Sequence, residues 1–276
     1  MVGSEVENIV PALIRALSRA VYTLCMDILA IKTFTIVAVM LGITAFSSKL
    51  NKAFETRWEF WGLFIGSLAL LFIIPGFAFP INLILTLVFA VLMGLMIGPA
   101  IKGIMISFVV RKRLEAQGYT KARLKEMPAE EQKQLIATIQ KELLEGNEHA
   151  SLAQDWNNIM GLAIYSTAAI TVLAAVIVFF SGIDFSFLGT GLFIALLGLI
   201  VVGILNAFFF KSPLMRLVSA YVGAVVFSLY LLYDFNRLRE AVGDTSWETA
   251  INIAISIYLD IINLFLDLLQ ILGDSN

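Results

Sequence analysis

Long apolar stretches, separated by polar connections, constrain this 276-residue sequence more than any other feature. An α-helix needs about 20 apolar residues to cross a bilayer, and it satisfies its own backbone hydrogen bonds there. A hydropathy scan finds seven stretches near this length, the first being the shortest. The predicted spans are residues 33–48, 60–79, 81–101, 159–181, 187–210, 214–233 and 250–272.

The composition indicates that lipid is the solvent of this chain. Hydrophobic residues make up 59% and charged residues 14%, with a mean hydropathy of +0.89. Soluble domains are about 45–50% apolar and about 25% charged. The sequence therefore predicts an all-α polytopic membrane protein with seven transmembrane helices, and it excludes a soluble enzyme or a disordered chain. A net charge of −2 offers no phosphate-binding surface, so nucleic acid is not an expected partner.

The predicted spans divide the chain into four regions. Residues 1–32 form an N-terminal segment, 33–110 hold helices one to three, 111–155 are a hydrophilic insertion, and 156–276 hold helices four to seven. The N-terminal segment has apolar residues at helical spacing together with charges, which favours an interfacial amphipathic helix over an eighth span. Its start, MVGSEVEN, is acidic where a signal peptide is basic. We therefore expect insertion through the spans themselves.

The insertion at 111–155 carries eight of the nineteen basic residues and eight of the twenty-one acidic ones. Gly118 and Pro128 predict a split into two short amphipathic helices. A solvated connector is the simpler interpretation of this segment. A docking site for a membrane-protein partner is the alternative.

Polar residues inside the last span are the main candidates for function. Asp260, Asn263 and Asp267 have the spacing i, i+3 and i+7, which places them on one face of one helix. Asp260 and Asp267 should stand roughly 10 Å apart along the axis. A carboxylate facing lipid would cost about 2.5–3.5 kcal/mol, so this face must look into the bundle. The spacing predicts a central seventh helix whose three polar residues line an ion pathway.

A second carboxyl group, Asp234, closes the sixth predicted span. If it packs against Asp260, the two like charges can share a proton or bind a hard cation such as calcium. Asp234 and Asp260 are therefore the predicted pH-sensing and gating pair, and a possible calcium site. In the alternative interpretation, Asp234 pairs with Arg237 at a wet helix end.

Signs of enzyme chemistry are weak. With one histidine (His149) and one cysteine (Cys25), the chain can build neither a histidine-rich metal site nor an internal disulfide. It has no H-E-x-x-H motif. A paired-aspartate protease would need both carboxyls in mid-span, whereas we place Asp234 at a helix end. We therefore expect no enzyme activity and no cofactor.

The same C-terminal residues resemble a known family. VVFSLYLLYDFNRL and ISIYLDIINLFLDLLQILG are similar to the C-terminal hallmark of the Bax inhibitor family, the transmembrane Bax-inhibitor-motif proteins. GIDFSFLG resembles the entry to that family's fifth helix, IYSTAAITVLAAVIVFFSG its fourth and FAVLMGLMIGPAI its third. The resemblance covers residues 33–273 without the insertion, and it is densest near the C-terminus.

The resemblance implies a seven-helix bundle in a bacterial plasma membrane or in an organelle membrane. It implies a pH-sensitive calcium leak whose paired aspartates match Asp234 and Asp260. Family members also suppress cell death, and a bacterial relative modulates a membrane-bound protease. This chain departs from the family in three places. Asp267 stands where relatives often carry a neutral residue, and the insertion 111–155 has no counterpart in compact members. The second span lacks the basic residue with which some relatives contact the aspartate pair.

Three functions follow as expectations. The first is a calcium (cation) leak channel gated by protonation of Asp234 and Asp260. The alternative is a regulatory membrane protein that binds a membrane protease or a cell-death partner through 111–155. A proton-coupled transporter is the third. The orientation stays open, because the Lys and Arg distribution places the N-terminus outside, whereas the family places it in the cytoplasm.

Overall fold

The computed structural model describes residues 28–50, 57–119, 123, 126–145, 150–241 and 243–275, and all regular structure in them is helical. The predicted all-α class is confirmed. The amphipathic helix expected in the N-terminal segment falls almost wholly outside the described residues. The main helices are Ile28–Leu50, α2 (Arg57–Ile73), α3 (Ile81–Ala116), α5 (Ala129–Glu145), α6 (Ala150–Ser181), α7 (Leu188–Leu205), α8 (Pro213–Glu240) and α9 (Trp247–Ser275).

Six of the described helices are long and apolar enough to cross a membrane. The predicted second span corresponds instead to a shorter apolar helix, Trp61–Gly76. Pro75 and Gly76 end it within a 3-10 turn, Ile74–Gly76, because neither residue favours continued helix. Together, the six long helices and this shorter one agree with the predicted count of seven.

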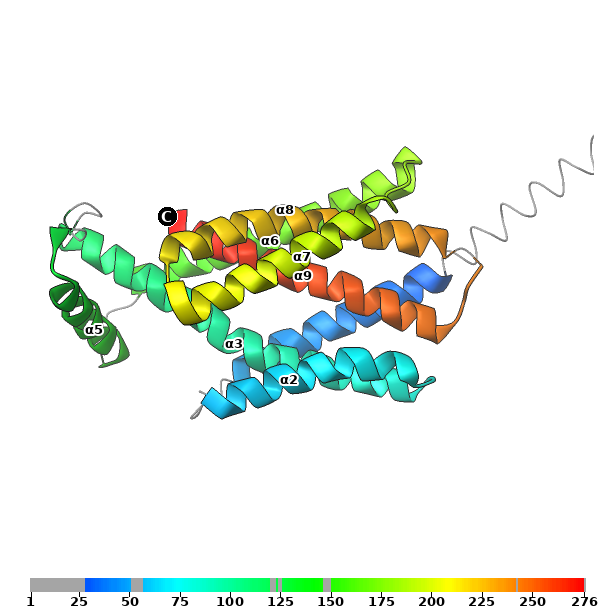
Figure 1. The fold of residues 1–276 in the computed structure, drawn as a ribbon, viewed down its shortest axis with the longest axis horizontal. Helices are drawn as coiled ribbons and strands as arrows, with labels where there is room; N and C mark the ends of the chain where they lie inside the picture. The colour runs from blue at the N-terminus through cyan, green and yellow to red at the C-terminus, as the bar shows by residue number, and fades with distance from the viewer. Residues whose placement is uncertain are drawn as a thin grey trace, which may run out of the picture.

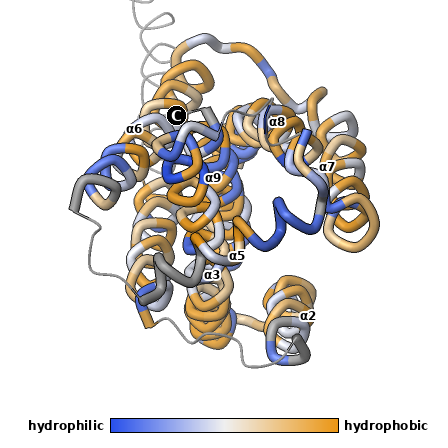
Figure 2. The backbone as a smooth tube through the Cα atoms, turned by 90° about the vertical axis from the view of Figure 1, so that its left-hand side faces the viewer, coloured by the Kyte–Doolittle hydropathy of each residue, from blue (hydrophilic) through white to orange (hydrophobic). Residues whose placement is uncertain are grey.

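Helix α9 occupies the centre of the bundle. Figure 1 shows it between α6, α7 and α8 on one side and α2, α3 and the first helix on the other, and Figure 2 shows the same grouping from one end. Its most extensive contact is with α8, followed by α6 and α3. Its apolar window is 44% buried, against 6% for the outer span Leu188–Phe210. The predicted central position of the last helix is confirmed.

The first helix packs closely against α3 through two glycines of the sequence GLMIG. A methyl group added at Gly98 would lie 2.5 Å from the carbonyl oxygen of Ser48, and one at Gly94 would lie 2.6 Å from that of Thr44. Small residues four apart are the usual means by which two membrane helices approach at backbone distance. This contact fixes the first helix beside α3 and α9.

The insertion is built differently from the prediction. Helix α3 runs through Pro99 and continues to Ala116, so residues 111–116 extend a membrane helix instead of forming a separate short one. No proline lies between Pro99 and Gly118, and the single glycine there, Gly103, lowers helix propensity without ending the helix. Helix α5 begins just after Pro128, as predicted, and its Ile139 packs against Val110 and Leu114 of α3.

Helix α8 is also longer than predicted, because it continues to Glu240. Asp234 therefore lies inside a helix, and the expectation that it marks a helix end is wrong. The segment FNRLRE has a polar composition that hydropathy reads as outside the span, yet most of these residues are compatible with helix. Polarity marked the end of the apolar stretch, not the end of the helix.

Candidate functional site

Asp234 of α8 and Asp260 of α9 meet at the contact between the two helices. Both are buried, with exposed fractions of 2% and 6%. Their carboxyl groups lie within hydrogen-bonding reach of each other. The predicted approach of these two residues is thus seen in the structure. Oδ2 of Asp260 is buried without a protein hydrogen-bond partner among the described residues.

Arg237 completes this group from one turn further along α8. Its Nη1 donates to Oδ1 of Asp234 at 3.0 Å and to Oγ of Ser256 at 3.4 Å. The guanidinium therefore links α8 to α9. Asp234 therefore pairs with Arg237, as the alternative interpretation expected, but the pair forms at a buried position inside α8 and not at a wet helix end.

The charge balance of this group determines what it can do. With both carboxyls ionised, Asp234, Asp260 and Arg237 sum to one negative charge, and one proton or one further positive charge neutralises them. Two ionised carboxylates in contact repel each other, whereas a shared proton makes a hydrogen bond between them. The group can therefore exchange a proton or a cation, and each exchange changes the force between α8 and α9.

A hydroxyl contact joins the first helix to α9 near Asp260. The Thr44 and Tyr258 hydroxyls lie 2.6 Å apart, and Thr44 Oγ1 donates to the carbonyl of Ala90 at 3.1 Å. Tyr258 is fully buried. Sequence reasoning did not select this contact, although a tyrosine and a threonine inside apolar spans are the available signal. It ties the central helix to both neighbours on the side away from α8.

Asp267 lies further along the same face of α9, at a different contact with α8. An added methyl group at Gly223 would lie 2.2 Å from its Oδ2, so this carboxyl sits directly against the α8 backbone. Oδ2 is buried and has no protein hydrogen-bond partner among the residues described. Asn263, between the two aspartates, is half-buried.

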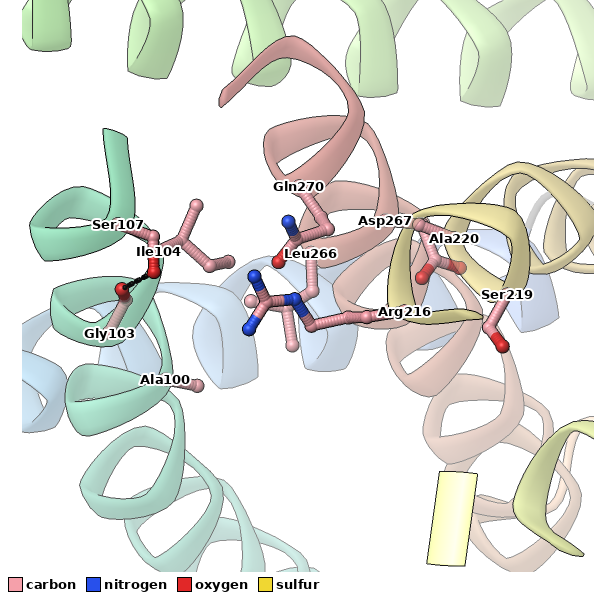
Figure 3. A pocket seen from close by; sticks show the side chains of 10 residues that line it. All are labelled: Ala100, Gly103, Ile104, Ser107, Arg216, Ser219, Ala220, Leu266, Asp267 and Gln270. Atoms are coloured by element: carbon pink, nitrogen blue, oxygen red, sulfur yellow. Dashed lines mark hydrogen bonds between the residues drawn. The ribbon is translucent and has the colours of Figure 1, made fainter. Parts of the chain in front are cut away.

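Asp267 also lines a cavity of about 600 Å³ between α3, α8 and α9. Figure 3 shows Arg216 of α8 and Gln270 of α9 at the same cavity. Arg216 was not selected from the sequence, because a single basic residue near the edge of a span is common at membrane interfaces. Its significance comes from the position that the fold gives it.

Beyond the membrane spans, the α6–α7 connection is tied to the end of α8. The Nδ2 group of Asn236 donates to Oδ1 of Asp184 at 3.0 Å, and Arg239 donates to the carbonyl oxygens of Val178 at 2.7 Å and Ile183 at 2.8 Å. Hydrogen bonds from the Ser186 backbone N–H and hydroxyl, with a weaker one from Asn236, lower the pKa of Asp184 from 3.8 to about 2. This cluster fixes the C-terminal end of α8, the part of the helix that carries Asp234.

The C-terminal end of α9 is capped by Arg111, which lies in the part of α3 that extends beyond the predicted span. Arg111 Nη1 donates to the carbonyl of Asp274 at 2.7 Å and lies 3.5 Å from its carboxylate, and Nη2 donates to the carbonyl of Gly273. A cation at these last carbonyls is favourable because they carry the negative end of the helix dipole. The C-terminal end of the central helix is thus fixed to α3, and the end of α8 that carries Asp234 is fixed to the α6–α7 connection.

Calcium can be tested against these residues as a permeating ion. The pair Asp234 and Asp260 supplies up to four carboxylate oxygens, whereas calcium takes six to eight oxygens in a stable site. In the described part of the chain, no group of three or more His, Cys, Asp or Glu side chains is placed to hold a metal. The pair alone therefore offers fewer oxygens than a stable calcium site requires.

The fold and the site define a class: an integral multi-pass helical membrane protein whose central helix carries buried carboxyl groups facing its neighbours. Residues 146–276 match the family model described as inhibitor of apoptosis-promoting Bax1. The resemblance to the Bax inhibitor family that the sequence predicted is thereby confirmed over this part of the chain, which holds Asp234, Asp260 and Asp267.

Individual relatives match over a similar region. The Golgi anti-apoptotic protein of Vaccinia virus (strain Lister) is 44% identical over 93 residues, which are 34% of this chain and 38% of that protein. Protein lifeguard 4 of Mus musculus is 42% identical over 93 residues, 34% of this chain and 37% of its own. An uncharacterized protein of Campylobacter jejuni is 39% identical over 93 residues, 34% and 38% of the two chains. The matches thus span well under half of each relative.

Proposed function

We propose that this protein is a pH-sensitive calcium (cation) leak channel, gated by protonation of the Asp234–Asp260 pair. The observation that carries the proposal is the contact of two buried carboxyl groups across the α8–α9 interface. The proposed location is a bacterial plasma membrane. An organelle membrane is the alternative, which the Golgi-named viral relative favours.

The gate works through the force between two helices. When the pair holds one proton, a hydrogen bond joins α8 to α9 and the polar face of α9 is closed off. When the proton leaves, the two carboxylates repel each other. A cation that enters between them then offsets this repulsion, as the proton did before. Arg237 offsets part of the repulsion, because it donates to Asp234. The leak should therefore rise as the pH rises from acid to neutral.

The pathway continues along the face of α9 that the gate controls. Asn263 and Asp267 follow Asp260 on that face, and Asp267 opens onto the cavity between α3, α8 and α9. Polar groups at this depth in a membrane are retained where they face water or ions. Asp260, Asn263 and Asp267 are the proposed pathway residues.

Calcium flux into proteoliposomes tests the proposal. The purified protein should leak several-fold more calcium at neutral pH than at acid pH, and Asp234→Asn or Asp260→Asn should remove this pH dependence. Glu130→Gln is the matched control, because Glu130 is an exposed carboxylate on α5 that forms a salt bridge with Lys133, away from α8 and α9. Protein that leaks no calcium at any pH, or Asn variants that keep the wild-type pH dependence, would contradict the channel function.

A second function is favoured by the names of two relatives, the Golgi anti-apoptotic protein and protein lifeguard 4. In this alternative, the chain is a regulatory membrane protein whose partner, a membrane protease or a cell-death protein, contacts the insertion 111–155. Ile139 of α5 already packs on α3, so a partner would meet the charged face of α5. Reversing the charges of Glu130 and Lys133 should then abolish partner capture by crosslinking without altering calcium flux.

A further inference from the structure

The cavity between α3, α8 and α9 lies near the end of the bundle where α8 begins and α9 ends. Figure 3 shows its lining: Ser107 comes from α3, Arg216 and Ser219 from α8, and Asp267 and Gln270 from α9. Its volume of about 600 Å³ has room for roughly 20 water molecules at liquid density. Each of the three helices contributes at least one polar or charged side chain to this space, so it can hold water and ions.

Two side chains of opposite charge line this cavity without pairing. In the described residues, neither Arg216 nor Asp267 forms a salt bridge. Figure 3 shows Arg216 reaching from α8 toward α3, while the Asp267 carboxyl lies beside Ala220. Asp267 packs at the level of Gly223, seven residues after Arg216, so it lies roughly 10 Å further along α8. Arg216 is exposed, whereas Oδ2 of Asp267 is buried, so Arg216 lies nearer the opening of the cavity than Asp267 does.

We propose that this cavity is the water-filled vestibule of the cation pathway, with Asp267 as its receiving carboxylate and Arg216 as a tethered cation that keeps the leak low. The proposal rests on the proposed channel function and adds the regulation of entry to it. The Arg216 guanidinium is exposed at the rim, so it can repel an incoming cation or turn inward toward Asp267.

Elementary electrostatics gives the size of the effect. A fixed unit charge at about 8 Å, in surroundings intermediate between water and protein, changes the local concentration of a monovalent cation by about tenfold. A divalent cation feels twice the interaction. Replacing Arg216 with a neutral residue should therefore enrich the vestibule in cations, whereas Arg216→Lys should preserve the barrier. Neutralising Asp267 should act in the opposite direction.

Cysteine modification tests the vestibule without any measurement of flux. In a Cys25→Ser background, Ser219→Cys places a thiol on the cavity wall, and its rates with a cationic and an anionic methanethiosulfonate reagent are compared in proteoliposomes. Arg216→Gln should shift the rate ratio about tenfold toward the cationic reagent. Arg216→Lys should leave it nearly unchanged, and Asp267→Asn should shift it toward the anionic reagent. Thr245→Cys, exposed in the α8–α9 connection, is the control whose ratio should not respond to position 216.

Two results would overturn the vestibule: a Ser219→Cys thiol that reacts with neither reagent, or a ratio that Arg216→Gln leaves unchanged. Calcium flux then separates this inference from the function on which it rests. Arg216→Gln should raise the leak several-fold and Arg216→Lys should not. If the ratio shifts but no variant leaks calcium, the channel function fails while the charged vestibule stands. If the wild type leaks and Arg216→Gln changes neither ratio nor leak, the role of Arg216 fails and the channel stands.

Discussion

The two carboxyl sites on α9 share one face of one helix, yet their surroundings differ. Asp260 meets Asp234, and Arg237 bonds to that pair, so each charge has an immediate neighbour. Asp267 meets the bare backbone at Gly223, and the nearest basic residue in its cavity, Arg216, forms no ion pair with it. A helical spacing of seven thus brought similar residues into two unlike environments.

The difference matches two roles that the proposed channel would need. A carboxyl pair held by an arginine has few accessible states, namely with or without a proton, which suits a gate. A lone carboxyl beside a cavity could accept and release a cation without moving a helix, which suits the proposed entry site. The comparison therefore predicts that perturbing the first site changes stability and gating, whereas perturbing the second changes entry and charge preference.

The largest expected effect is at Arg237. Arg237→Gln removes the positive charge bonded to Asp234, leaving two buried carboxyls without their cation. We expect a loss of about 2–3 kcal/mol in the free energy of unfolding at neutral pH. Thermal or denaturant unfolding in detergent measures it.

Arg216→Gln is the matched control for Arg237→Gln, because it removes the same group from the same helix at a position without an ion pair among the described residues. A change below about 0.5 kcal/mol is expected, as for other exposed side chains. Equal losses for the two variants would mean that the two arginines do not differ in the way the structure shows.

A smaller effect is expected at Gly223, where Asp267 leaves no room for a side chain. Gly223→Ala should cost about 1–3 kcal/mol, because the new methyl group overlaps the Asp267 carboxyl. Gly198→Ala is the control: nothing lies within 4 Å of its added methyl group, so it should be neutral or stabilising.

A double-mutant cycle connects the Gly223 loss to its cause. In an Asp267→Ala background, Gly223→Ala should no longer destabilise the protein, because the overlapping group is gone. Unfolding of all four proteins in the same detergent gives the coupling energy. If the loss persists without the Asp267 carboxyl, the close packing at Gly223 has another origin.

Sequence reasoning found the polar face of α9 because helical spacing is a local property. The i, i+3 and i+7 positions of Asp260, Asn263 and Asp267 needed no tertiary contact to be recognised. The same reasoning ended α8 too early, since hydropathy reports where apolar character stops, while a helix continues until a breaker or a cap ends it. That error placed Asp234 at a wet end instead of inside the bundle.

The parts that the sequence could not reveal depend on tertiary contacts. Arg111 of α3 donates to a backbone carbonyl at the end of α9, and Arg239 of α8 donates to one near the end of α6. Because every residue carries a backbone carbonyl, no side-chain pattern in the sequence predicts these contacts. Arg216 gained its role because α3 and α9 close a cavity around it. Local periodicity could identify which face of a helix matters, but not which neighbours it meets.

The smallest expected effect is that of Asp184→Asn on the unfolding temperature, which reports how acid affects the fold outside the proposed gate. Asp184 lies outside the spans, and its pKa in the folded protein is lowered to about 2 by hydrogen bonds from Ser186 and Asn236. A depressed pKa means that the stabilisation is complete above the unfolded value near 3.8 and is lost as the pH falls through about 2. Asp184→Asn should therefore lower the unfolding temperature slightly at neutral pH, with the difference from wild type shrinking between these two values. A difference that instead disappeared well above the unfolded value near 3.8 would contradict the hydrogen bonds to the ionised Asp184 carboxylate as its origin.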